Sequence, residues 1–95
     1  MIIEQIPLEN GTAIGLKLEM QNAPLLVIRA DKGFVMCGYM DTEMANKLGD
    51  VAAKVRGVNN FEDVLHAEVL DVTNHAKALG IKAGMKGHEA LEMMF

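Results

Sequence analysis

The chain has 95 residues, a formal net charge of −4 at pH 7 and a hydrophobic content of 51%. This length predicts one domain, residues 1–95, because compact domains usually span about 100 to 150 residues. Affinity for nucleic acid depends on clustered Lys and Arg, so the acidic balance and the lack of a basic run argue against a nucleic-acid partner. No window approaches the roughly 18 consecutive apolar residues of a membrane span, and we expect no membrane partner.

The cysteine and methionine contents indicate the cellular compartment of the protein and its tendency to self-associate. The chain contains one Cys, eight Met and no Trp. One cysteine cannot form an internal disulfide, and the segment from Met1 to Gln5 lacks the basic start of a signal peptide, so we expect a reduced, cytoplasmic protein. A small domain this rich in apolar residues leaves apolar surface that a symmetric copy can bury. We therefore predict a homodimer or another homo-oligomer.

The first 20 residues predict a β-hairpin. Asn10-Gly11 separates segments 2–8 and 13–20 and suits a two-residue turn, because Asn and Gly best tolerate the positive φ of such turns. In the second segment large apolar residues alternate with small or charged ones, which is the period of a strand with one buried face. The residues expected on the buried face are Ile14, Leu16, Leu18 and Met20, and those expected in solvent are Ala13, Gly15, Lys17 and Glu19.

Two further strands are predicted next. The continuous apolar run at 25–28 suits a central strand that is covered on both faces. Asp31-Lys32-Gly33 indicates a second reversal, with Gly33 in the left-handed position that closes a three-residue hairpin loop. The fourth strand is predicted over residues 33–39.

The pattern then changes to that of a helix, predicted over residues 42–56. Its apolar residues are spaced by four, three and four positions and define one amphipathic face, formed by Met44, Leu48, Val51 and Val55. Asp41 or Thr42 can cap the start, and Gly57 supplies the left-handed residue that commonly ends a helix. Gly49 in the interior indicates a close approach to a strand or a partner.

The last third of the chain is predicted to end in two short helices. Residues 65–72 fit either a helix or a strand, and the β-branched ending before Thr73-Asn74 favours a fifth strand. A short helix is expected over 74–79, ending at Gly80, and another opens near Gly87. The fold class is therefore α+β: a mainly antiparallel sheet of four to five strands in a β-meander, one longer helix packed on a face, and two short C-terminal helices.

Cys37 is the candidate nucleophile or redox thiol. It lies two residues before the chain's one tyrosine, Tyr39, at the predicted junction between a strand and a capped helix, with Gly38 between them. A helix start favours a thiolate, but Asp41 and Glu43 place negative charge at the same helix end. The alternative is that Cys37 is a small buried hydrophobic residue, which is the usual environment of a free cysteine.

The three histidines are His66, His75 and His88. On the predicted fifth strand His66 and Glu68 would share one face as a possible metal pair. Their spacing matches no zinc motif, so we predict no metal site, and the sequence assigns no cofactor.

A Gly-x-x-Gly segment near the end of the chain is the remaining candidate for ligand binding. Gly84, Lys86, Gly87 and His88 could present amides and a cation to an anion or a nucleotide. The competing interpretation is a connection between two helices, in which Gly80 ends one helix and Gly87 begins the next. We favour the connection.

Three groups of residues resemble the YunC-like family of small bacterial and archaeal proteins. They are the run from Gly33 to Asp41 with Cys37-Gly38-Tyr39, the pair Gly57-Val58 followed by Glu62-Asp63, and the tail from Ala78 to Leu91 with its Gly-Met-x-Gly element. The resemblance covers about residues 24–92. That family is a domain of unknown function, so the resemblance implies a compact α+β domain and no particular reaction.

The leading hypothesis is a noncatalytic, self-associating binding or interaction module. It accounts for the apolar excess and for the lack of an acid–base motif. One alternative is a small cysteine-dependent enzyme or redox protein that uses Cys37, with Tyr39 or a spatially adjacent histidine as its partner. Another is an anion- or nucleotide-binding domain that uses the turn from Gly84 to His88. A small-molecule ligand fits each of them.

Overall fold

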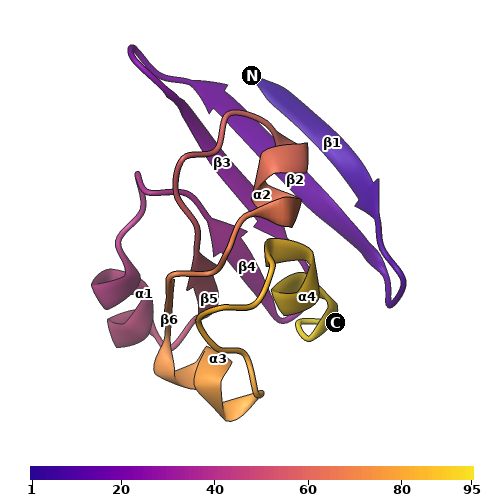
Figure 1. Cartoon of the computed structure of the whole chain (residues 1–95), viewed down its shortest axis with the longest axis vertical. Helices are drawn as coiled ribbons and strands as arrows, with labels where there is room; N and C mark the ends of the chain where they lie inside the picture. Colours follow the sequence, from indigo (N-terminus) through magenta and orange to yellow (C-terminus); the bar gives the residue numbers. More distant parts are fainter.

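A six-stranded sheet in the order β1-β2-β3-β4-β5-β6 organises the chain, which the computed structural model describes from Met1 to Phe95 (Figure 1). The elements are β1 (Ile2–Pro7), β2 (Thr12–Glu19), β3 (Pro24–Arg29), β4 (Gly33–Met36), α1 (Thr42–Leu48), β5 (Val51–Lys54), α2 (Phe61–His66), β6 (Asp71–Val72), α3 (Asn74–Ala78) and α4 (Gly87–Glu92). Strands β1 to β4 form an antiparallel meander, β4 and β5 are parallel, and β5 and β6 are antiparallel. The α+β class is confirmed, but the sheet is mixed and has six strands.

The two hairpins form where the sequence predicts them, with different turns. The chain reverses through four residues, and the Leu8 amide donates to the Gly11 carbonyl at 2.8 Å. Neither Asn10 nor Gly11 has a positive φ, so the predicted two-residue turn is wrong. Gly33 is not left-handed either. It lies in β4, where a Cβ atom would collide with the Val51 carbonyl of β5, so this glycine permits the close approach of two parallel strands.

The predicted helix over 42–56 is wrong in its second half. Helix α1 ends at Gly49, which has a φ of 80° and donates its amide to the Asn46 carbonyl. After one further residue the chain enters β5, which pairs with β4. Val51 and Val55 match a helical spacing, but β-branched residues also suit a strand, and Gly49 separates the two elements. Gly57 has a φ of 71° and lies in the loop to α2 instead of ending a helix.

The strand predicted over 65–72 is also wrong for most of its length. Helix α2 occupies Phe61–His66, and its N-cap residue Asn60 accepts the Asp63 amide at 2.8 Å. Only Asp71–Val72 forms a strand, at the edge of the sheet. The fourth predicted strand is shorter than expected and ends at Met36. The two C-terminal helices are confirmed, although no helix in the protein is longer than α1.

Helices cover the two faces of the sheet unequally. On one face α2 and α4 bury the main core, which includes Leu26, Ile28 and Val35 (Figure 1). On the other face α1 covers only the region of β4 and β5, where Ala45 packs with Met36 and Ala52. The second face over β1 to β3 is left without a helix. None of the helices is long and apolar enough to cross a membrane.

The buried and exposed faces of strand β2 are the reverse of those predicted. Ala13 and Gly15 are buried in the main core, whereas Ile14 is 41% exposed and Leu18 is 39% exposed. The period of two is correct, but the large apolar residues face away from α2. The reason is the ring of Phe61, which lies against Gly15 and fills the space that a larger residue would need.

Candidate functional site

A cleft of about 370 Å³ opens beside the carboxyl ends of β4 and β5. Three connections form its walls: the β2–β3 turn, the loop from β4 to α1, and the loop from β5 to α2. The lining residues are Ala23, Pro24, Cys37, Gly38, Tyr39, Arg56, Gly57, Val58 and Asn59. Cys37, Gly38 and Tyr39, which the sequence singles out as one candidate site, therefore lie together in the largest hollow of the molecule.

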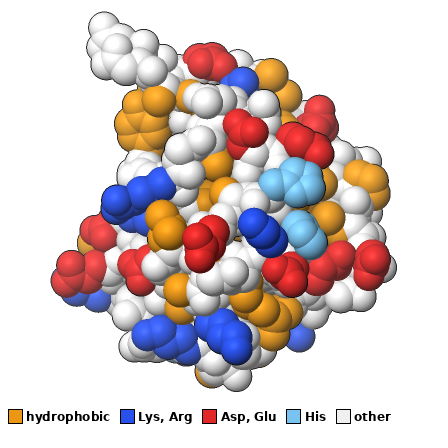
Figure 2. Space-filling view, in the orientation of Figure 1, with side chains coloured by type: hydrophobic (Ala, Val, Ile, Leu, Met, Phe, Trp, Pro, Cys, Tyr) orange, Lys and Arg blue, Asp and Glu red, His pale blue; other side chains and the backbone are white.

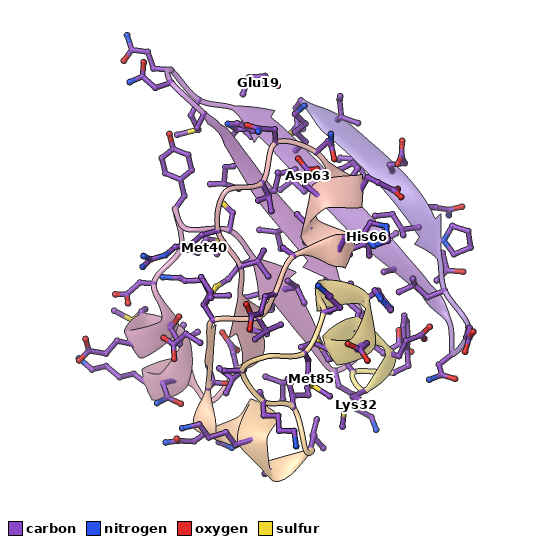
Figure 3. The ribbon with its side chains drawn as sticks, in the orientation of Figure 1. Glu19, Lys32, Met40, Asp63, His66 and Met85 are labelled. Atoms are coloured by element: carbon purple, nitrogen blue, oxygen red, sulfur yellow. The ribbon has the colours of Figure 1, made fainter.

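The topology of the sheet explains why a cleft lies at this position. The chain leaves β4 toward α1 on one face of the sheet and leaves β5 toward α2 on the other face. Figure 3 shows Met40 in the first of these loops, on the way to α1. Two parallel neighbouring strands whose connections turn to opposite faces leave a crevice between the loops, and this is the position at which open α/β sheets bind ligands.

Cys37 has a structural role at the base of the cleft. The side chain is 3% exposed, its amide donates to the Leu26 carbonyl at 3.0 Å, and its sulfur accepts the Leu26 amide at 3.3 Å. The Cys37 carbonyl would be the partner of the Leu26 amide in a continuing strand, but it instead accepts the Met40 amide at 3.2 Å. The thiol thus satisfies a buried backbone donor where β4 turns away from β3.

Arg56 and Tyr39 are the exposed side chains of the cleft that carry a charge or a hydroxyl group. The Arg56 guanidinium forms no ion pair with a carboxylate of the chain, and Tyr39 is 49% exposed. A Cβ atom at Gly38 would lie 3.6 Å from Arg56 Cγ, so these two loops lie close together beside the cleft. None of the three histidines is among the lining residues, so no imidazole stands beside Cys37 as a base.

Two of the histidines meet elsewhere, on the surface of α2 and α4. The ring centroids of His66 and His88 are 6.0 Å apart, and His66 Nε2 lies 3.1 Å from the Glu62 carboxylate. Figure 3 shows His66 at the end of α2 that faces α4, and Figure 2 shows histidine side chains close to acidic ones on this side of the molecule. His66 ends a helix, so the strand-face pairing with Glu68 does not form. No group of three His, Cys, Asp or Glu side chains is placed to hold a metal ion.

The segment from Gly84 to His88 connects the loop after α3 to α4. The Gly84 amide donates to the Val69 carbonyl and the Gly87 amide to the Ala67 carbonyl, both at 2.9 Å. Gly84 has a φ of 96°, and a Cβ atom at Gly87 would collide with the Val64 carbonyl of α2. Gly87 therefore lets the connection lie against α2, Gly84 supplies a left-handed turn, and the amides of both glycines are already bonded. Lys86 is exposed and His88 half-buried beside this turn.

The sequence interpretation missed the second wall of the cleft. The sequence interpretation places Arg56 at the end of a helix, because the spacing of Val51 and Val55 indicates one continuous helix. The signal that could have located this wall is Gly49, which divides the segment into a helix and a strand. A strand ending at residue 54 would have placed Arg56 beside the end of β4.

These features define a small α+β domain with a mixed sheet and a cleft at the ends of its parallel strand pair. A family model described as "Domain of unknown function (DUF1805)" matches residues 36–94. The uncharacterized protein YunC of Bacillus subtilis (strain 168) is 38% identical over 87 residues, which cover 87% of this chain and 84% of that protein. The chain therefore belongs to this YunC-like family, whose function is unknown.

A solved structure shows the same fold. The crystal structure of a protein of unknown function, TA1206 from Thermoplasma acidophilum, matches with a TM-score of 0.95 and 34% identity. The match covers 99% of this chain and 92% of that chain. The six-stranded arrangement is thus shared along almost the whole length of both proteins.

Proposed function

We propose that this protein is a noncatalytic interaction module that forms a homodimer through the uncovered face of β1 to β3. The observation that carries the proposal is the reversed orientation of β2, whose large apolar residues face away from the core. The name "open face" denotes here the five apolar residues Ile3, Ile14, Leu16, Leu18 and Val27.

Strand register places these side chains on one surface. Ile3 lies opposite Leu16, and Leu16 lies opposite Val27 on the next strand. Directly opposite residues of paired strands project from the same face, so these three form a row across the sheet. Ile14 and Leu18 are two positions either side of Leu16 and share its face. Ile3, Ile14 and Leu18 are exposed, Leu16 is half-buried, and Val27 packs at the edge of the open face against the cluster beneath α1.

The polar residues around the open face are few. Gln5 lies opposite Ile14 on one side and Arg29 lies opposite it on the other. The two charged residues of β2 are Lys17 and Glu19, which form an ion pair at 3.4 Å on the core side of the strand. Monomeric proteins seldom expose apolar patches larger than a few hundred Å². A face with this composition is typical of a surface that a partner covers.

Its size suits a second copy of the chain. The broad side of the molecule measures 34 × 28 Å. A stable interface buries roughly 800 Å² on each partner, and a side of these dimensions is broad enough to hold a patch of that size. Two such sheets pack about 10 Å apart with interdigitated side chains. One patch that packs on its own copy closes the assembly as a two-fold dimer.

A matched pair of variants tests the proposal. Leu18→Lys places a charge on the open face, and Leu79→Lys makes the same change at an equally exposed leucine, because both side chains are 39% exposed. Size-exclusion chromatography with light scattering should give a dimer for the wild type and for Leu79→Lys, and a monomer for Leu18→Lys. Circular dichroism checks that all three are folded. A dimer that survives Leu18→Lys, or a wild type that is monomeric, contradicts the proposal.

Thiol chemistry at Cys37 is the second candidate function, because this residue lines the cleft with Tyr39 and Arg56. The single free thiol is also consistent with our proposal that the protein acts in the reducing cytoplasm. The hydrogen bond from Leu26 and the 3% exposure of Cys37 favour a packing role for the sulfur. The rate of alkylation of Cys37 distinguishes thiol chemistry from a packing role. A catalytic thiol would react faster in the folded protein than in the protein unfolded by urea.

A further inference from the structure

Arg56 is an unpaired cation in a hollow. Its side chain is exposed, and it takes part in neither of the two ion pairs of the chain. A guanidinium presents five donors in a planar fork that matches a carboxylate or a phosphate. The Asn59 side chain lies in the same wall and adds a neutral amide that both donates and accepts.

The two loops of the cleft also carry unused backbone donors. Within these two loops, the amides of five lining residues take part in no hydrogen bond within the chain; they are Gly38, Tyr39, Arg56, Gly57 and Val58. Cys37 and Val55, which precede these loops, use their amides in bonds to the Leu26 and Met36 carbonyls. Backbone amides from two sides of a crevice, next to a guanidinium, favour an anionic group.

The rest of the cleft is apolar. Pro24 and Ala23 form one side, Val58 forms the other, and Tyr39 contributes an aromatic ring at the mouth. The volume of about 370 Å³ lies at the low end of the range for small-molecule sites, which is about 300 to 1,000 Å³. A few polar groups in an apolar hollow are the usual composition of such a site.

We propose that this cleft binds a small organic anion, whose carboxylate or phosphate is held by Arg56 and whose apolar body packs between Pro24, Tyr39 and Val58. Two carboxylates near this end of the sheet already accept backbone amides. Asp63 accepts the Asn59 amide at 3.0 Å, and Asp41 accepts the Glu43 amide at 2.9 Å at the start of α1. Arg56 is therefore the charged side chain of the cleft itself. The proposal is independent of association through the open face.

Titrations followed by amide NMR shifts test this proposal on the whole chain. The probes are phenylacetate, phenyl phosphate and the neutral benzyl alcohol, with inorganic phosphate as a probe without an apolar body. At least one aromatic anion should give saturable shifts at Gly38, Gly57 and Val58, and should bind at least about tenfold more tightly than benzyl alcohol or inorganic phosphate. Saturation with only one of the two anions identifies the preferred acidic group.

Two variants locate the anion. Arg56→Gln should weaken binding at least about tenfold, because a charge-assisted pair is lost. Arg29→Gln removes the same charge from an exposed arginine on β3 outside the cleft, and it should leave the affinity unchanged. Leu18→Lys should also keep the affinity, so that failure of the dimer does not affect this test. Lack of saturation with both anions, equal binding of benzyl alcohol, or unchanged binding by Arg56→Gln overturns the proposal.

Discussion

The ring of Phe61 lies directly on Gly15, across the interface between α2 and β2. A Cβ atom at Gly15 would be 2.7 Å from Phe61 Cε1 and 2.8 Å from Ile6 Cδ1. The core side of β2 is therefore built from small residues, and the aromatic ring of the helix supplies the apolar volume. This contact turns Ile14 and Leu18 outward and creates the open face.

The first prediction compares three Gly→Ala changes in chemical denaturation. Gly87→Ala should cost the most, above about 3 kcal/mol, because its methyl group would meet the Val64 backbone, which cannot move without separating α2 from α4. Gly15→Ala should cost about 1 to 3 kcal/mol, because the ends of the Phe61 and Ile6 side chains can shift. Gly38→Ala is the control, since its methyl group meets nothing closer than Arg56 Cγ. A reversed order of Gly87→Ala and Gly15→Ala would refute this account.

The second prediction concerns a fully buried hydroxyl that joins α3 to β5. Thr73 Oγ1 donates to the Asp50 carbonyl at 2.7 Å and accepts the amides of Ala52 at 3.1 Å and Ala76 at 3.3 Å. Thr73→Val keeps the shape but leaves buried groups without partners, and it should lower the free energy of unfolding by about 2 to 4 kcal/mol.

Thr42→Val is the matched control for this change. The Thr42 hydroxyl is buried and has no hydrogen-bond partner, so its removal should leave stability within about 1 kcal/mol of the wild type or raise it. Urea denaturation of the two variants provides the comparison. Equal losses in both would mean that the hydrogen bonds of Thr73 do not account for its effect.

The third prediction addresses the sulfur of Cys37. Cys37→Ala leaves the Leu26 amide without an acceptor inside the sheet and should cost about 1 to 3 kcal/mol. Cys37→Ser retains an acceptor in nearly the same place and should lose less. Thermal unfolding of both variants measures the difference. If Cys37→Ala is as stable as the wild type, the sulfur has no structural task and the thiol-chemistry alternative gains weight.

The fourth prediction concerns the contact between the first hairpin and α4. The two carboxylate oxygens of Glu92 accept the amides of Glu9 and Asn10, each at 2.9 Å. Glu92→Gln retains only one acceptor oxygen and should lower stability by about 1 to 2 kcal/mol. Glu9→Gln makes the same chemical change in the hairpin, where the side chain has no hydrogen bond, and should have little effect. Similar losses from both variants would point to net charge as the cause.

The local sequence signals predicted much of the secondary structure. Alternation, the Asn-Gly segment, and the glycines at Gly80 and Gly87 correctly located the first strands and the last helices, because these signals act within a few residues. The orientation of β2 could not be predicted in the same way, since it depends on Phe61, some 46 positions away. The prediction of a helix over residues 51–55 is wrong because a short apolar run fits the period of a helix as well as that of a strand. The pairing with β4 makes this segment a strand.

The sequence predicted one of the two loops that carry the candidate site. Cys37-Gly38-Tyr39 was located by its composition and by its place after a strand. Arg56 joins it only because β4 and β5 are parallel, so that both strands end at the same edge of the sheet. A parallel pairing is a long-range relationship that the spacing of residues does not reveal.

Association through the open face is the central claim, and the mass of the native chain in solution tests it most directly. Sedimentation equilibrium over a range of micromolar concentrations should give twice the chain mass of 10.3 kDa, falling toward the chain mass only on dilution. The same experiment on Leu18→Lys should give the chain mass throughout. A native chain that sediments at 10.3 kDa at every concentration would contradict the account.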